Sequence, residues 1–107
     1  RRVYPEEKDT AKSVTVGPFR MIPAGRQLFV DGKPVELTSS EYNIMLAILQ
    51  GRGEVLTREQ LKQALWPESA DRKERIVDVH VASLRKKLGN FRKHIRTVHG
   101  RGYRVMA

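Results

Sequence analysis

The sequence lacks the residues and runs on which several classes of protein depend. It has no cysteine, which excludes disulfide frameworks, iron–sulfur clusters, cysteine zinc sites and thiol catalysis. Its apolar runs last only a few residues, too short for a membrane-spanning helix or for the core of a signal peptide. No nucleophile elbow, Walker loop or HExxH pattern is present, so we expect neither an enzyme nor a bound cofactor.

The histidines do not indicate a metal site. His80, His94 and His99 all lie in the last third of the chain. None of them is paired at the i, i+4 spacing that places two ligands on one face of a helix, and no cysteine supplements them. We therefore predict no bound metal.

Acidic side chains are scarce in only one part of the chain. The 107 residues carry a formal net charge of +9. Residues 1–70 are nearly neutral at +1, whereas residues 71–107 hold eleven basic and three acidic side chains, a net charge of +8. A neutral body with a basic C-terminal third indicates a surface that binds a polyanion, with nucleic acid as the first candidate. A solvated basic surface without such a partner is the alternative.

The chain divides into a short tail and one domain of the α+β class. Residues 1–13 mix charges without periodicity and are interpreted as a linker or tail of a longer protein. Residues 14–37 alternate short apolar runs with turn signals, which predicts an N-terminal antiparallel sheet. Asp31-Gly32 between two apolar runs is typical of a tight hairpin, and Pro34 favours an edge strand. We assign residues 14–107 to the domain.

Three helices are predicted over residues 38–88. Thr38 with Glu41, and Thr57 with Gln60, have the spacing of capping boxes, in which each side chain bonds the other residue's backbone N–H. We therefore expect one helix to begin at each threonine. Both are followed by apolar residues at helical spacing, so each helix has a side that can face a core.

The third helix and a hairpin form the end of the domain. The helix is predicted over residues 72–88, with Asp71 as its N-cap and Gly89 as its stop. Its apolar stripe consists of Val77, Val81, Leu84 and Leu88. Residues 95–106 predict a β-hairpin with a two-residue type II′ turn at Gly100-Arg101.

The side of the third helix opposite the apolar stripe is the expected functional site. On a helical wheel it holds Arg75, Asp78, Val79, Ala82, Ser83 and Lys86. Short side chains at its centre would let the helix approach base edges in the major groove of DNA, and Arg75 and Lys86 would reach phosphates. Val79 suits a thymine methyl, Asp78 a cytosine amine, and Ser83 either kind of base edge. An ordinary solvated helix face is the alternative.

Several segments together resemble the OmpR/PhoB-type DNA-binding domain of bacterial response regulators. They are LTSSEY at 37–42, LTREQL at 56–61, LW at 65–66, RIVDVHVASLRKKL at 75–88 and IRTVHGRGYR at 95–104. They occur in the expected order, and the resemblance covers about residues 14–107. It implies a winged helix-turn-helix: a four-stranded antiparallel sheet, three helices, and a C-terminal β-hairpin wing. Helix 72–88 would be the recognition helix in the major groove, and wing 95–106 would enter the minor groove.

The resemblance also implies roles for individual residues. Phosphate contacts would come from Trp66, Arg75, His80, Arg85 and Thr97, beside Lys86 from the wheel. Base or groove contacts would come from Asp78, Val79, Ser83 and either His99 or Arg101, beside Ala82 from the wheel. Members of the family often carry arginine where this chain has Ala82, Ser83 and His99.

Partners follow from the same resemblance. It implies a transcriptional regulator of a two-component system that binds direct repeats in double-stranded DNA as a tandem dimer. The loop at residues 67–74 would touch RNA polymerase, and an N-terminal receiver domain would be controlled by a sensor kinase. Some members of the family instead attach this domain to a membrane anchor or to another module. Such a regulator would work in the bacterial cytoplasm, associated with the nucleoid, without membrane contact by this domain.

Two other functions fit the charge. A small basic RNA-binding protein would stack bases on exposed aromatic side chains, and aromatic residues are few in this sequence. A winged-helix module that binds another protein would show no salt-dependent binding of DNA. Competition between duplex DNA and RNA distinguishes a DNA-binding domain from the RNA-binding protein. A salt titration of DNA binding distinguishes it from the module that binds another protein.

Overall fold

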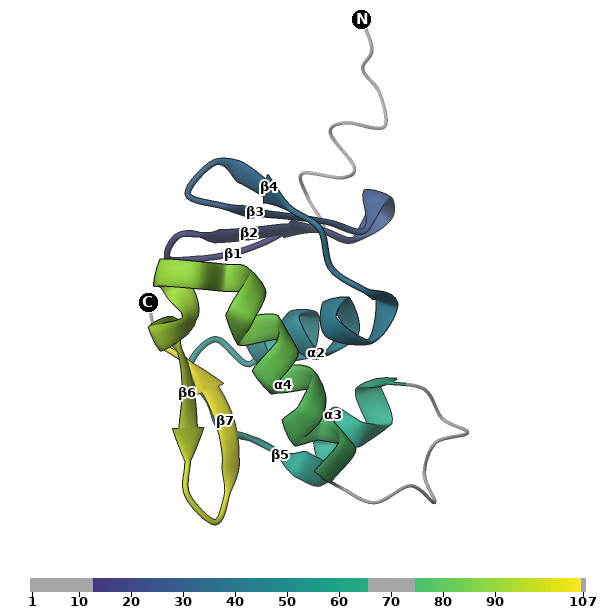
Figure 1. The fold of residues 1–107 in the computed structure, drawn as a ribbon, viewed down its shortest axis with the longest axis vertical. Coiled ribbons are helices and arrows are strands. Elements are labelled where there is room, and N and C mark those ends of the chain that lie inside the picture. Colours follow the sequence, from purple (N-terminus) through teal and green to yellow (C-terminus); the bar gives the residue numbers. More distant parts are fainter. Residues whose placement is uncertain (1–12, 66–74, 107) are drawn as a thin grey trace, which may run out of the picture.

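The computed structural model describes residues 13–65 and 75–106. In these residues the order of elements is sheet, three α-helices and hairpin, as predicted (Figure 1). The elements are β1 (Val14–Val16), β2 (Phe19–Ile22), η1 (Pro23–Gly25), β3 (Gln27–Val30), β4 (Lys33–Val35), α2 (Ser39–Gln50), β5 (Leu56–Thr57), α3 (Arg58–Leu65), α4 (Arg75–Leu88), η3 (Gly89–His94), β6 (Ile95–Val98) and β7 (Gly102–Val105). The predicted tail lies outside the described residues except for Ser13, as do Trp66, Asp71 and the first residues of the predicted third helix.

The N-terminal sheet is antiparallel, with the strand order β1-β2-β3-β4. Asp31 and Gly32 both have positive φ, 53° and 81°, and Val30 pairs with Lys33 across the turn. A two-residue hairpin of this kind needs φ > 0 at both central residues, so the predicted hairpin is confirmed. Pro34 lies in β4 at the edge of the sheet, where its missing N–H removes no bond between central strands.

Both predicted capping boxes are present. At the start of α2, the Glu41 N–H donates to Thr38 Oγ1 at 3.2 Å and the Thr38 N–H donates to Glu41 Oε1 at 2.9 Å. At the start of α3, the Gln60 N–H donates to Thr57 Oγ1 at 3.0 Å and the Thr57 N–H donates to Gln60 Oε1 at 2.8 Å. These bonds satisfy N–H groups that have no partner within the helix.

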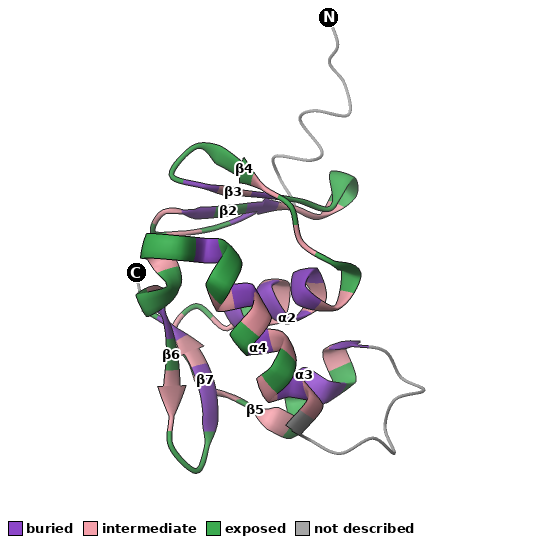
Figure 2. Cartoon of the chain, in the orientation of Figure 1, coloured by how far each residue is buried: buried purple, intermediate pink, exposed green. Residues whose placement is uncertain are grey.

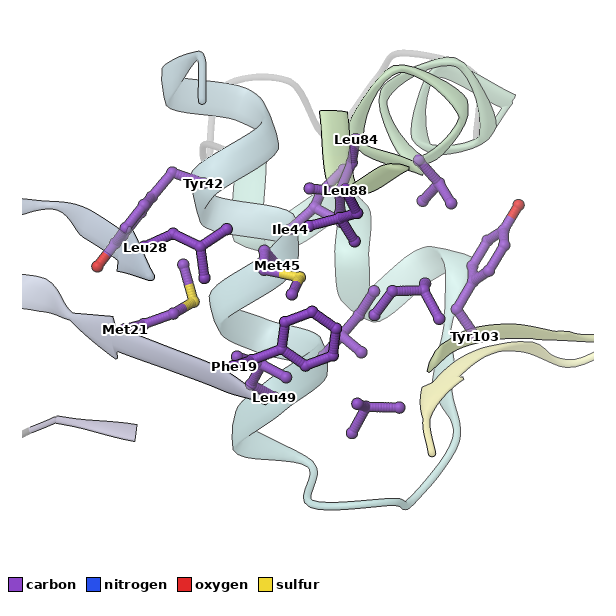
Figure 3. Close-up of a cluster of buried hydrophobic side chains, with 14 of the residues drawn as sticks. Phe19, Met21, Leu28, Tyr42, Ile44, Met45, Leu49, Leu84, Leu88 and Tyr103 are labelled. Atoms are coloured by element: carbon purple, nitrogen blue, oxygen red, sulfur yellow. The ribbon is translucent and has the colours of Figure 1, made fainter. Parts of the chain in front are cut away.

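The core lies between the N-terminal sheet and the helices (Figures 2 and 3). Phe19, Met21 and Leu28 enter it from the sheet, and Met45 and Leu49 enter it from α2; all are at most 2% exposed. The predicted stripe of α4 is also buried, and it consists of Val77, Val81, Leu84 and Leu88. Burial of this stripe turns the opposite side of α4 toward solvent.

The hairpin differs from the prediction in its turn. Val98 pairs with Gly102, so residues 99–101 form a three-residue loop, and the Arg101 N–H donates to Val98 O at 2.9 Å. The predicted two-residue turn at Gly100-Arg101 is therefore wrong. The observed register pairs Ile95 with Val105, both buried; a slip of one residue would put them on opposite faces.

A third strand, β5, was not predicted. It pairs with β7, so the hairpin belongs to a three-stranded sheet in the order β5-β7-β6. Two residues are too few to show the alternation by which a strand is recognised. Gly102 makes this pairing possible, because a Cβ on it would lie 1.9 Å from Leu56 O. The hairpin is thereby fastened to the segment that leads into α3.

Candidate nucleic-acid interface

The solvent-facing side of α4 carries short, mostly apolar side chains at its centre. Val79 is 64% exposed, and Ala82 and Lys86 are also exposed. These three residues follow one another at three- and four-residue spacing, so they lie on one side of the helix. His80, beside them, is half-buried. The α4 backbone is described from Arg75, but the Arg75 side chain lies outside the described part.

Asp78 does not point freely into solvent. Its Oδ1 accepts a bond from Arg58 Nε at 2.9 Å and another from the Tyr103 hydroxyl at 2.5 Å. Burial and the bond to Asp78 raise the pKa of Tyr103, and the same carboxylate raises the pKa of Arg58. Asp78 therefore links α4 to α3 and to β7.

Arg85 extends this contact to the other strand of the hairpin. Its Nη2 donates to Thr97 Oγ1 at 2.9 Å, and both Nε and Nη2 donate to Ile95 O. Its guanidinium also lies 5.4 Å from the centre of the Tyr103 ring. We call Arg58, Asp78, Arg85, Thr97 and Tyr103 the Asp78 cluster. It holds α4 and the hairpin together as one surface.

Ser83 also turns inward. Its hydroxyl donates to Glu41 Oε2 at 2.5 Å, and Lys87 Nζ donates to Glu41 Oε1 at 2.7 Å. Glu41 is only 2% exposed. Burial raises its pKa, but the bonds from Lys87, Ser83 and the Thr38 backbone outweigh burial and lower the pKa to about 2. We call Glu41, Ser83 and Lys87 the Glu41 cluster; it ties α4 to α2.

The tip of the hairpin carries two of the expected groove residues. His99 and Arg101 are both exposed in the loop between β6 and β7. The tip of the hairpin lies at the end of the molecule away from the N-terminal sheet (Figure 1). Its tip and the solvent-facing side of α4 can therefore reach a ligand outside the domain.

A basic groove lies along α4, η3 and β6. The groove is shallow and open to solvent, has a volume of about 380 Å³, and is lined by Arg85, Arg92, Lys93, Ile95, Arg96 and Thr97. Of these, the sequence predicted only Arg85 and Thr97 as contact residues. Arg92, Lys93 and Arg96 were counted in the basic third, but no motif located them on one surface. Four cations in a groove without an acidic lining residue create a positive potential that attracts phosphate groups.

The described ranges hold neither a cluster of metal ligands nor a membrane-spanning helix. Among residues 13–65 and 75–106, no three or more His, Asp or Glu side chains gather as metal ligands would. None of the helices in these ranges combines the length and apolarity of a membrane span. Trp66 and the loop 67–74, for which DNA and polymerase contacts were expected, lie outside them.

Comparison with known proteins gives close relatives. Residues 32–105 match the family described as "Transcriptional regulatory protein, C terminal". The chain is 43% identical over 89 residues to the response regulator protein PmrA of Pseudomonas aeruginosa, covering 83% of this chain and 39% of that protein. It is 34% identical over 97 residues to the phosphate regulon transcriptional regulatory protein PhoB of the same organism, covering 90% and 42%. It therefore spans about two fifths of the length of these relatives.

A solved structure shares the fold. The DNA-binding domain of RstA from Klebsiella pneumoniae, determined in complex with the RstA box, superimposes with a TM-score of 0.76 at 28% identity. The match covers 88% of this chain and 96% of that one. The arrangement of sheet, helices and hairpin described above is thus the winged helix-turn-helix that the sequence predicted.

Proposed function

The chain belongs to the family of transcriptional regulatory C-terminal domains of the OmpR/PhoB type, and from this premise we propose that it binds specific sequences in double-stranded DNA. The observation that carries the proposal is the single surface formed by the solvent-facing side of α4 and the hairpin. Residues 71–107, which contain α4 and the hairpin, hold +8 of the chain's net charge of +9. We assign α4 to the major groove and the β6–β7 hairpin, as the wing, to the minor groove.

Phosphate contacts would set the position of the domain on the duplex. We assign them to Arg85, Lys86, Thr97 and His80, with Trp66 and Arg75 expected beside them. The basic groove supports this assignment, since Arg92, Lys93 and Arg96 add charge next to Arg85 and Thr97. Contacts of this kind supply affinity but carry no sequence information.

The wing tip would contribute a second contact. His99 and Arg101 are exposed in the loop at its end. A cationic side chain is drawn into a narrow minor groove because the potential there is strongly negative. We therefore assign His99 and Arg101 to the minor groove beside the major-groove site of α4.

The rest of the regulator is proposed from the family. Because the chain spans about two fifths of its relatives, we propose that residues 1–13 form a linker to an N-terminal receiver domain controlled by a sensor kinase. We further propose tandem dimers on direct repeats, contact with RNA polymerase through the loop 67–74, and action in the bacterial cytoplasm at the nucleoid. These proposals rest on family membership alone.

A salt titration tests the proposed function. Binding of the 107-residue chain to a labelled duplex selected from random sequence is measured by fluorescence anisotropy at several salt concentrations. The association constant is expected to fall steeply, with a logarithmic slope of roughly 0.9 for each phosphate neutralised. Lys86→Gln should reduce the slope by about one such contact.

A matched control shows whether that effect is local. Lys33 is also an exposed lysine, but it lies on β4 in the N-terminal sheet. Lys33→Gln should leave the slope unchanged. Equal effects of the two variants would contradict the assignment of α4 to the duplex. Preference for RNA in competition would favour an RNA-binding protein, and binding of no duplex would favour a module that binds protein.

A further inference from the structure

The centre of the α4 surface contains two kinds of short side chain. Asp78 and Ser83 can form hydrogen bonds with base edges, whereas Val79 and Ala82 present only methyl groups. The structure treats the two kinds differently. Both polar side chains are half-buried and bonded inward, and both apolar ones are exposed.

Asp78 is held by two donors. Its Oδ1 accepts from Arg58 at 2.9 Å, a charge-assisted bond, and from the buried Tyr103 hydroxyl at 2.5 Å. A reorientation of this carboxylate toward a base would leave the Tyr103 hydroxyl without its acceptor inside the protein. The two bonds therefore hold Oδ1 of Asp78 toward α3 and β7.

Ser83 is held even more firmly. Its hydroxyl donates to Glu41, a carboxylate that is 2% exposed and depends on donors within the protein. A buried charge that loses a donor is penalised more than a neutral group, because water does not replace the bond. The single hydroxyl proton of Ser83 is therefore committed to the Glu41 cluster, which leaves this side chain no donor for a base edge.

What is left facing outward is a pair of apolar side chains. Val79 is 64% exposed, Ala82 is exposed, and one helical turn separates them. The base edges of the major groove offer one apolar group, the 5-methyl of thymine. Lys86, one turn beyond Ala82, is exposed where it can reach a phosphate of the same duplex.

We propose that α4 reads thymine methyl groups through Val79 and Ala82, and that its specificity rests on apolar contact rather than on hydrogen bonds to bases. This inference rests on the proposed function and names the bases that the same surface recognises. Thymine is distinguished from cytosine by the methyl itself, and T·A from A·T by the strand that carries it.

Replacing thymine with deoxyuridine tests the inference directly, because it removes only the 5-methyl group. The duplex is the one selected from random sequence by the 107-residue chain, and its thymines are replaced one at a time. Affinity should fall about fourfold at each thymine that faces Val79 or Ala82, the factor expected for burying one methyl-sized group. Thymines flanking the selected site are the control and should show no loss.

A variant of the protein identifies the contact. Val79 is exposed, so Val79→Ala removes two methyl groups without opening a cavity. In this variant the deoxyuridine penalty should shrink at the thymine facing position 79 and stay unchanged at the thymine facing Ala82. A general loss of stability would weaken binding to all duplexes equally and would leave both penalties in place.

Three results have distinct meanings. A specific duplex that tolerates deoxyuridine at every thymine, or contains none at the α4 site, overturns the inference but not the proposed function. A change of preferred base in Ser83→Ala or Asp78→Asn also overturns it, because those side chains would then be readers. If no duplex is enriched and none is bound, the proposed function and the inference both fall.

Discussion

Two polar clusters hold α4 in its place, and they differ in how far water reaches them. In the Glu41 cluster the central carboxylate is 2% exposed and accepts from Ser83, Lys87 and the Thr38 backbone. In the Asp78 cluster the central carboxylate belongs to a side chain that is 40% exposed. Both are carboxylates with a cationic partner, so burial is the main difference between them.

Burial decides what each cluster contributes. A carboxylate shielded from water depends on its protein donors, so the Glu41 cluster contributes mainly to the free energy of unfolding. A carboxylate that water reaches is partly stabilised without its partners, and an ion pair at this exposure contributes little. The Asp78 cluster instead joins parts that could otherwise move, namely α4 and the wing. It therefore contributes mainly to the orientation of the DNA-binding surface.

Removal of Glu41 should have the largest effect. Glu41→Ala deletes the capping box of α2 and the acceptor of Ser83 and Lys87, so the free energy of unfolding should fall by about 3–4 kcal/mol. Urea denaturation measures this value. Glu36→Ala, at an exposed glutamate just before the helix, should change it by less than about 0.5 kcal/mol. Similar values for the two variants would show that burial does not set the strength of the cluster.

Acid should weaken the same cluster. The pKa of Glu41 is lowered from 4.5 to about 2 in the folded chain, so its contribution is complete above about pH 4.5 and is lost as pH falls toward 2. The shift corresponds to about 3 kcal/mol. The difference in unfolding free energy between the wild type and Glu41→Ala should therefore shrink over this range. A difference that stays constant down to pH 2 would contradict the lowered pKa.

Removing a member of the Asp78 cluster should change the free energy of unfolding less and should change the affinity for DNA. Tyr103→Phe removes the hydroxyl that donates to Asp78, which should lower the free energy of unfolding by about 1 kcal/mol. Because the wing is then held less firmly, affinity for all duplexes should fall while the preferred sequence stays the same. Thermal denaturation measures the change in stability, and random-sequence selection shows whether the preferred sequence stays the same.

A second buried tyrosine provides the matched control. Tyr42 is also buried, but its hydroxyl has no hydrogen-bond partner among the described residues. Tyr42→Phe should therefore be neutral or slightly stabilising, since an unsatisfied buried polar group costs free energy. If both tyrosine variants are neutral, the bond between Tyr103 and Asp78 makes no contribution.

The wing tip should show the smallest effect on stability. Arg101 is exposed in a loop, so Arg101→Ala should change the free energy of unfolding by less than about 0.5 kcal/mol. It should still reduce the salt dependence of duplex binding by about one unit of neutralised charge, because a cation in the minor groove also releases counterions from the duplex. The reduction should be smaller in a Tyr103→Phe background, in which the wing is no longer held against α4. Equal reductions in both backgrounds would show that the Asp78 cluster does not orient the wing on the duplex.

Features that depend on neighbours in sequence were predictable. The capping boxes at Thr38 and Thr57 join residues three apart, and the hairpin at Asp31-Gly32 depends on two adjacent residues. The buried stripe of α4 follows from helical spacing alone. In each case the interacting residues are close in sequence, so their spacing alone indicates the local structure that brings them together.

Features that join distant segments were not predictable in this way. A helical wheel places Asp78 and Ser83 opposite the core, but it cannot show that Arg58, Tyr103 and Glu41 lie beside them. The predicted turn of the wing was wrong by one residue. The register of the hairpin follows the burial of Ile95 and Val105 and not the local preference of glycine for turn positions. The helical wheel therefore assigned Asp78 and Ser83 to bases without showing that both side chains also bond to other elements of the chain.

The sequence by itself determined the order of sheet, three helices and hairpin, the positions of the helices and the basic third of the chain, because periodicity, capping and charge are local properties. The winged helix-turn-helix was implied by the resemblance of its motifs to a known family. Only the tertiary structure decided which side chains of α4 remain exposed. Glu41 and Tyr103 lie 42 and 25 residues from the α4 side chains they bond, and they draw Ser83 and Asp78 inward. A buried carboxylate needs donors and a buried hydroxyl needs an acceptor, and folding brings these partners together.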